Sequence, residues 1–171
     1  MKKNVSITLV LLLIPLVILS HVSWSTTENG LLFNVDGRDV DFVGMINDKW
    51  RLATKTCHSV TALENSDARL NDIKKLVQTY SPPDSIHVKS LYAWTTGSWA
   101  VAEVEFETLL PAVVTIKNLD KKMVIVDDAI WSGLTTPWVS GPFIRTYLGR
   151  GTSQVPHVLL DCFELQTKSF K

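Results

Sequence analysis

Two adjacent carboxylates, Asp127 and Asp128, end the strongly apolar segment MVIV and are the first candidates for acid–base chemistry. If one of them pointed into a pocket lined by a sheet, it could act as a general base. The alternative is structural. Adjacent strand residues face opposite ways, so one carboxylate would lie in water and the other would pair with a Lys or Arg across the sheet. The sequence leaves both interpretations open.

Thiol and metal chemistry have less support. His58 stands beside Cys57, but adjacent side chains on an extended chain point apart, so this histidine is badly placed to activate the thiol. His58, His87 and His157 are scattered without ligand spacing. The chain contains no Gly-x-Ser-x-Gly motif, no phosphate-binding loop and no His-Glu-x-x-His motif. We therefore expect no catalytic set, no metal and no cofactor.

A row of acids gives the first candidate interface. Glu103, Glu105 and Glu107 alternate with apolar residues in the segment WAVAEVEFE, so they share one face of a strand. Three acids on one face predict that this face is turned toward water, and Trp99 shares it. The functional alternative is a docking surface for a basic partner.

A second candidate interface lies in a Gly- and Pro-rich segment that contains Trp138, Phe143 and Arg145. Aromatic residues together with Arg in a loop are typical of binding hot spots. The structural alternative is that Trp138 and Phe143 close one open end of the sheet, while Arg145 forms an ion pair with Asp127 or Asp128. These two interpretations are the most evenly balanced in the chain.

The N-terminus reads as an export signal. Lys2 and Lys3 precede an apolar run, Ile7 to Leu19, and Ser23-Trp24-Ser25 resembles a cleavage site, so we expect residues 1–25 to be a signal peptide and 26–171 to be one α+β domain. The alternative is an uncleaved anchor, although the run is shorter than the roughly 20 residues of a spanning helix and contains Pro15.

Charge and cysteine content fit an exported chain. Removing Lys2 and Lys3 from the 17 basic residues leaves 15 against 17 acids, and no basic stripe is visible, so we expect no nucleic-acid partner. Cys57 and Cys162 are the only cysteines, and a single disulfide between them is the default in an oxidising compartment. It would close a loop of about 105 residues, worth about 4 kcal/mol in the chain-entropy model.

The elements that would position these residues follow from periodicity. Residues 67–80 repeat with helical spacing, with Leu70, Ile73 and Val77 on one face, and Ser81-Pro82-Pro83 ends the helix. Alternation and Val/Ile content predict strands at 86–94, 99–107, 112–117 and 123–131, with Trp94 on the face that packs on the helix.

Asp36-Gly37 could turn a small hairpin between 31–35 and 40–43, and 50–56 is a further short strand or a helical turn. Short helices are expected at 142–148 and after Pro156.

The predicted class is therefore α+β, with one main helix packed on an antiparallel sheet of about four strands and with short C-terminal helices. This order resembles the cystatin-like and NTF2-like architectures. The pattern Arg69, Ile73, Leu76, then Val88 and Leu91, then Gly97-Ser98-Trp99-Ala100, is also similar to small exported bacterial proteins of unassigned function. The resemblance covers about residues 66–132 and implies no catalytic residue.

These observations predict an exported, secreted or periplasmic, non-enzymatic protein that binds a protein or a cell-envelope component. Its most concrete form is an inhibitor or immunity-type protein that meets an envelope-acting partner. One alternative is an NTF2-like enzyme that uses Asp127 or Asp128 in a sheet-lined cavity. The other is an envelope protein held by its uncleaved N-terminal segment, which would be the only contact with a membrane.

Overall fold

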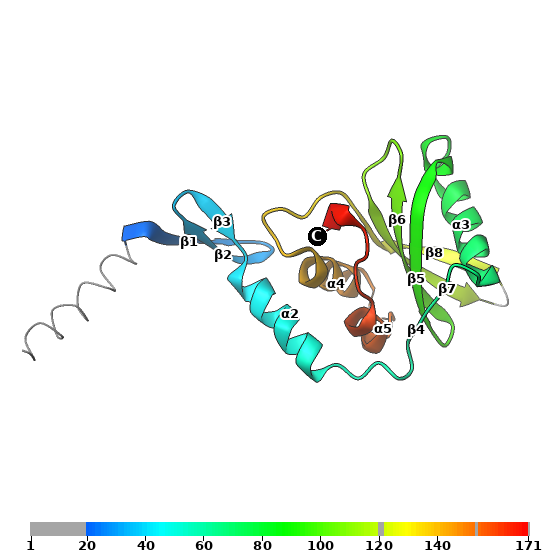
Figure 1. Cartoon of the computed structure of the whole chain (residues 1–171), viewed down its shortest axis with the longest axis horizontal. Helices are drawn as coiled ribbons and strands as arrows, with labels where there is room; N and C mark the ends of the chain where they lie inside the picture. The colour runs from blue at the N-terminus through cyan, green and yellow to red at the C-terminus, as the bar shows by residue number, and fades with distance from the viewer. Residues whose placement is uncertain (1–19, 120–121, 153, 171) are drawn as a thin grey trace, which may run out of the picture.

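The computed structural model describes residues 20–119, 122–152 and 154–170, and in them the fold is mixed α+β, with four α-helices and two antiparallel sheets. Figure 1 shows a small N-terminal sheet at one end and a larger sheet at the other, with helix α2 (Phe42–Thr54) running between them. The first 19 residues of the predicted signal peptide lie outside the described residues. No helix in the described ranges is both long and apolar enough to cross a membrane.

The N-terminal sheet has the order β1-β2-β3 and consists of β1 (Val22–Thr27), β2 (Gly30–Val35) and β3 (Arg38–Val40). The predicted turn at Asp36-Gly37 is confirmed, since Val35 pairs with Arg38 and both turn residues have positive φ, 51° and 81°. Such a two-residue turn matches the twist of the strands that it joins. The predicted second arm, 40–43, is wrong, because the strand is Arg38–Val40 and Asp41 caps α2, which begins at Phe42. The position of the predicted signal cleavage, after Ser25, falls within β1.

The larger sheet has five strands rather than the predicted four. Its order is β4-β5-β6-β7-β8, with β4 (Thr61–Ala62) pairing with the end of β5. The four predicted strands are present as β5 (Val88–Thr96), β6 (Trp99–Phe106), β7 (Ala112–Leu119) and β8 (Lys122–Ser132). A two-residue strand carries no alternation, which is why β4 has no signal in the sequence.

Helices cover both faces of this sheet. Helix α3 (Ala68–Tyr80), capped by Asp67, packs Ile73 and Val77 against Ala102 and Val104 on one face, and the 3₁₀ turn η1 (Asp84–Ile86) follows it. Helices α4 (Ser140–Gly151) and α5 (His157–Cys162) and the 3₁₀ turn η2 (Lys168–Phe170) pack on the other face. The prediction that the glutamate face of β6 is turned toward water is therefore wrong, because the C-terminal segment covers it.

An irregularity in β5 changes which face its residues occupy. The pairing of β5 with β6 shifts between Val88 and Ser90, and a bulge of one residue moves every later side chain to the opposite face. Trp94 consequently packs against Phe163, with 5.9 Å between the ring centroids, and not against α3 as predicted.

Helix α4 continues through Gly149-Arg150-Gly151, where the sequence predicts its end. These glycines permit close packing. A Cβ on Gly149 would touch Leu160, and one on Gly151 would overlap the backbone carbonyl oxygen of Asp128. Gly151 therefore lets the last turn of α4 lie directly on β8, Gly149 lets it lie against α5, and the pair does not break the helix.

Candidate binding surface

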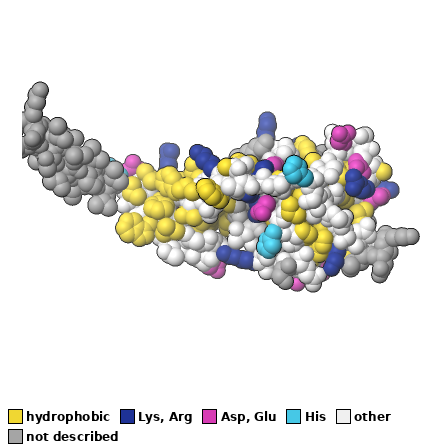
Figure 2. Space-filling model, turned by 90° about the horizontal axis from the view of Figure 1, so that it is seen from below, with side chains coloured by type: hydrophobic (Ala, Val, Ile, Leu, Met, Phe, Trp, Pro, Cys, Tyr) yellow, Lys and Arg dark blue, Asp and Glu magenta, His cyan; other side chains and the backbone are white. Residues whose placement is uncertain are grey.

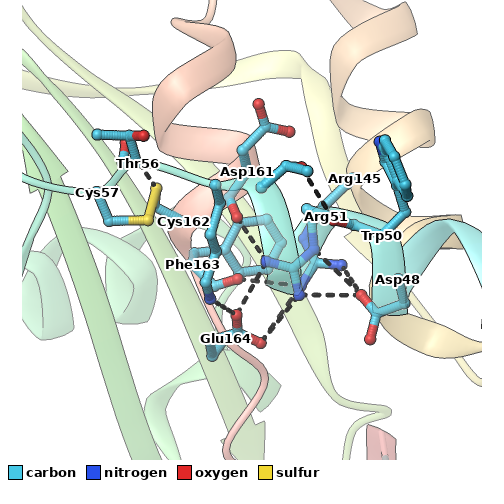
Figure 3. A network of polar contacts seen from close by, with 12 residues as sticks. Asp48, Trp50, Arg51, Thr56, Cys57, Arg145, Asp161, Cys162, Phe163 and Glu164 are labelled. Atoms are coloured by element: carbon cyan, nitrogen blue, oxygen red, sulfur yellow. Dashed lines mark hydrogen bonds and ion pairs between the residues drawn. A yellow bond between two sulfur atoms is a disulfide. The ribbon is translucent and has the colours of Figure 1, made fainter.

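The predicted disulfide is confirmed. Cys57 and Cys162 are bonded, with an S–S distance of 2.01 Å and a Cα–Cα distance of 5.6 Å. The bond joins the chain just after α2 to the end of α5, so neither sulfur is a reactive thiol (Figure 3).

The acidic row of β6 does not form a surface. Glu103 is fully buried and accepts hydrogen bonds from the backbone N–H groups of Gln166 (2.7 Å) and Thr167 (2.9 Å) and from the Thr167 hydroxyl (2.7 Å). Glu105 pairs with Lys89 at 3.2 Å, and that hydrogen bond holds the pKa of Glu105 below its usual value. Glu107 alone is exposed. A docking face made of the three glutamates is therefore excluded.

Trp99 is also less available than the sequence predicts. Its ring is half-buried, packs against the core beneath α4 and α5, and has the ammonium of Lys117 4.9 Å from its centroid. A cation over the face of an indole is attracted by the ring and restricts access to it.

The two candidate cavity acids are on the surface. Asp127 and Asp128 are both exposed, so the interpretation of either as a buried general base is wrong. Asp127 accepts a hydrogen bond of 2.7 Å from the Tyr80 hydroxyl, which raises the pKa of Tyr80. Neither aspartate pairs with Arg145, in contrast to the predicted structural alternative.

Arg145 belongs to a polar network between α2, α4 and the end of α5. Its guanidinium donates to Asp48 at 2.9 Å and to the Phe163 carbonyl at 3.1 Å, and it lies 3.6 Å from Glu164 (Figure 3). The side chain is almost completely buried, and burial, followed by the nearby charge of Arg51, lowers its pKa. Arg145 is therefore committed to contacts within the protein, and its buried guanidinium is not part of the accessible surface.

Arg51 and Lys55 complete this network from α2 and its C-cap. Arg51 donates to Asp48 (2.9 Å), to Glu164 (2.9 Å) and to the backbone carbonyl of Asp161 (2.6 Å), and Lys55 also bonds Glu164. Burial opposes the charge on Arg51, but its bonds to Glu164 and Asp48 outweigh that effect and raise its pKa. Burial likewise opposes ionisation of Glu164. The hydrogen bonds from Arg51 and Lys55 outweigh the effect of burial and lower the pKa of the Glu164 carboxyl.

The network fixes which side of α2 faces the protein. The inward side carries Gly44, Asp48 and Arg51, whereas the outward side is apolar. We call this outward side the outer face of α2 and define it by five of its exposed apolar residues, Phe42, Met45, Ile46, Trp50 and Leu52; a sixth, Val43, lines the hollow described below, and Lys49 is exposed on the same side. Sequence reasoning missed this surface. The signal that could have revealed it is the helical spacing of FVGMINDKWRL after Asp41, whose side chain caps the helix by accepting from the Gly44 N–H at 2.7 Å.

Trp138 and Phe143 line a hollow beside this helix. Their rings stack, with centroids 5.9 Å apart, and Trp131 meets Phe143 edge to face at 5.0 Å. The hollow has a volume of about 120 Å³ and lies between β2, α2 and α4, with Tyr147 and Arg150 exposed at its edge. We call it the Trp138 hollow. Of the predicted interface residues, Trp138 and Phe143 are the two that the fold brings together at an accessible site.

A larger, open depression of about 410 Å³ lies between α2 and α5 and is lined in part by Trp50, Arg51 and Asp161. The guanidinium in its wall is already bound to Asp48 and Glu164, so it has little capacity to hold a ligand. Neither Asp127 nor Asp128 lines this depression or the Trp138 hollow. Within the described ranges no three His, Cys, Asp or Glu side chains are grouped as metal ligands.

Comparisons of the chain with protein-family models, with curated proteins and with solved structures give no match. The resemblance to the cystatin-like and NTF2-like architectures therefore stays a prediction. The site itself is an aromatic hollow of limited volume next to an apolar helix face.

Proposed function

We propose that the protein is an exported, non-enzymatic binding protein that takes an apolar side chain of a partner protein into the Trp138 hollow. The observation that carries this proposal is the hollow itself, where stacked aromatic rings border an accessible space of about 120 Å³. Sites for small-molecule substrates usually measure roughly 300–1,000 Å³, so this volume suits one side chain of a partner better than a metabolite.

The surroundings of the hollow favour a protein partner. Anchor residues of protein interfaces are large apolar or aromatic side chains that enter a preformed pocket, surrounded by a polar rim. Asn47 and Arg150 provide polar groups at the edge, and Arg150 has no ion pair with a described residue. An inhibitor or immunity-type protein acting on an envelope enzyme is the most specific form of the proposal.

The place of action is inferred from the N-terminus and the disulfide. A disulfide joining two distant segments is typical of proteins that fold in an oxidising compartment. The basic and apolar start of the chain is typical of an export signal. Both features support a secreted or periplasmic location.

One observation favours a second candidate function, an envelope protein held by its N-terminal segment. All six residues of β1, from Val22 to Thr27, pair with β2. Cleavage after Ser25 would remove four of these six residues and leave Leu32 to Val35 of β2 without their partners on that side. Retention of the segment would preserve the sheet.

Site-specific photo-cross-linking in the producing cell tests the proposed binding site. Tyr147, at the edge of the hollow, and Tyr80, on α3, are similarly exposed (43% and 48%), so benzoylphenylalanine at each position gives a matched pair. We expect one discrete protein adduct from position 147 and none from position 80.

The substitution Thr146→Arg supplies the control, because Thr146 is an exposed lining residue and a longer side chain there would occupy the hollow without disturbing the core. The adduct from position 147 should disappear in this variant. Equal adducts from both positions, or an adduct that survives Thr146→Arg, would show that the hollow is not the binding site.

A further inference from the structure

The outer face of α2 is unusual because it is apolar and largely exposed, with Phe42 at its start packing edge to face on Phe33 of β2 at 5.5 Å. A surface helix ordinarily buries its apolar stripe against the core and exposes its polar side. Here Ile46 is 66% exposed and Trp50 is 71% exposed, while Asp48 and Arg51 point into the protein. The arrangement is the reverse of the usual one, and contiguous apolar surface of this kind marks an interaction site.

The helix cannot readily turn to hide this face. Arg51 and Asp48 are held by Glu164 and Arg145, and the N-terminal end is held by Asp41, which accepts from the Gly44 and Val139 N–H groups at 2.7 Å and 3.1 Å. Rotating the helix would leave the buried guanidinium of Arg145 and the partly buried Arg51 and Glu164 without these partners, which is destabilising. The fold therefore presents the apolar side to the exterior.

The apolar surface continues onto β1 and lies where the described structure begins. Trp24 of β1 is 65% exposed, and Figure 2 shows apolar side chains gathered over the end of the molecule formed by β1–β3 and α2. The apolar run Ile7–Leu19 is followed directly by Ser20 and His21, and β1 begins at Val22. Only two residues thus separate the end of the apolar run from the sheet next to α2.

We infer that the outer face of α2 and Trp24 lie in the interfacial layer of a lipid bilayer. This inference rests on the second candidate function, in which the N-terminal segment is retained. If Ile7–Leu19 enters the bilayer, the short connection to β1 places the N-terminal sheet at the lipid surface. The run is shorter than the roughly 20 residues of a spanning helix, and stable membrane attachment commonly needs two signals.

The composition of the surface fits lipid better than a second protein. Trp24 and Trp50 are of the residue type that concentrates at the boundary between lipid and water. Lys49 is the charged residue on the same side of the helix as Phe42 and Ile46, and its long side chain can reach the headgroups while its stem stays among apolar groups. Helices that lie on membranes have this form, with an apolar side below and cations at the headgroup level.

Lipid photolabelling of the full chain tests the inference. The protein is reconstituted in vesicles of phosphatidylethanolamine and phosphatidylglycerol that contain a phospholipid with a diazirine in its acyl chain. After irradiation, trypsin releases three informative peptides. Residues 4–38 contain the apolar run and Trp24, residues 39–49 contain Phe42, Met45 and Ile46, and residues 76–89 contain the exposed Tyr80 and Ile86 as a control.

We expect lipid adducts on 4–38 and 39–49 and none on 76–89. Ile46→Asp should reduce the yield on 39–49 about tenfold, because it replaces an apolar side chain in contact with lipid by a charged one. Ile86→Asp is the matched control on a distant exposed isoleucine, and it should leave the yield on 39–49 unchanged.

The other outcomes separate the two proposals. Adducts on 4–38 without adducts on 39–49 would overturn the contact through α2 while leaving the retained anchor in place. Absence of adducts on both peptides would overturn the anchor and the contact together. If 39–49 is unlabelled by lipid and a lysine cross-linker joins Lys49 of two chains, the outer face of α2 is a homodimer interface and the inference is wrong.

Discussion

Glu103→Ala is the sharpest test of the fold, because the buried carboxylate holds the C-terminal segment on β6. The carboxylate accepts three hydrogen bonds, two of them from the backbone N–H and hydroxyl of Thr167. Thr167 is itself buried, so its two donors have no access to water once the carboxylate is removed. The Gln166 N–H is closer to the surface and can donate to water when the carboxylate is absent.

The expected cost follows from these three donors. Each buried donor that loses its acceptor lowers the free energy of unfolding by about 1–3 kcal/mol. The partly buried bond from the Gln166 N–H adds little to this loss. Removing the carboxylate also relieves the penalty for its own burial, which offsets part of the loss. We therefore expect Glu103→Ala to lower the free energy of unfolding by about 3 kcal/mol.

Urea unfolding followed by tryptophan fluorescence measures this change, with the disulfide kept oxidised. Glu105→Ala is the matched control, since Glu105 lies on the same face of β6 but bonds only side chains, those of Lys89, Ser90 and Ser169, and leaves no buried backbone donor unpaired when it is removed. Its effect should be small, as for other surface pairs. Residues 163–170 should also become sensitive to carboxypeptidase in Glu103→Ala alone. Equal stability of the two variants would refute the assignment of Glu103 as the anchor of the C-terminal segment.

Three further outcomes follow from other contacts. Gly151→Ala should destabilise the protein more than Gly149→Ala, measured by thermal unfolding, because its Cβ would overlap the Asp128 carbonyl oxygen whereas a Cβ at position 149 only touches Leu160. The pKa of Glu164 is lowered in the fold from its ordinary value of 4.5. The stability that its ionised carboxylate adds is therefore fully present above pH 4.5 and is lost as the pH falls through the lowered pKa of the folded state. Glu164→Gln should consequently flatten the acid limb of the stability–pH curve, and an unchanged limb would contradict this role. Replacing both Cys57 and Cys162 by Ser should cost about 4 kcal/mol in urea unfolding, as expected for a long closed loop.

The sequence predicts α3 and β5–β8 well because their signals are local. Leu70, Ile73 and Val77 recur with helical spacing, and the alternation of β6 places Ala102 and Val104 against them, as the structure has it. The disulfide is also predictable, since two cysteines allow one pairing. These inferences need no knowledge of distant contacts.

The errors arise where distant segments decide the environment. The pattern of β6 places Glu103 opposite the helix face, but it cannot show that residues 166 and 167, more than sixty positions later, cover that side and donate to the carboxylate. The predicted face of Trp94 is wrong for a different reason. A single bulge near Lys89 reverses the alternation of the rest of β5.

Helix α2 shows how local and distant effects combine. An apolar stripe is normally read as the side that packs on the core, and that reading would place Ile46 and Trp50 inside. The structure reverses it, because Arg145, Glu164 and the segment tied down by the disulfide offer α2 a charged surface that only Asp48 and Arg51 can match. Buried ion pairs contribute little net stability compared with apolar packing, but their geometry selects one orientation. The outward position of the apolar stripe is therefore enforced by the charges beneath it. A fold that keeps such a stripe exposed while it buries Arg145 and partly desolvates four further charged groups is best explained by a surface that covers the stripe.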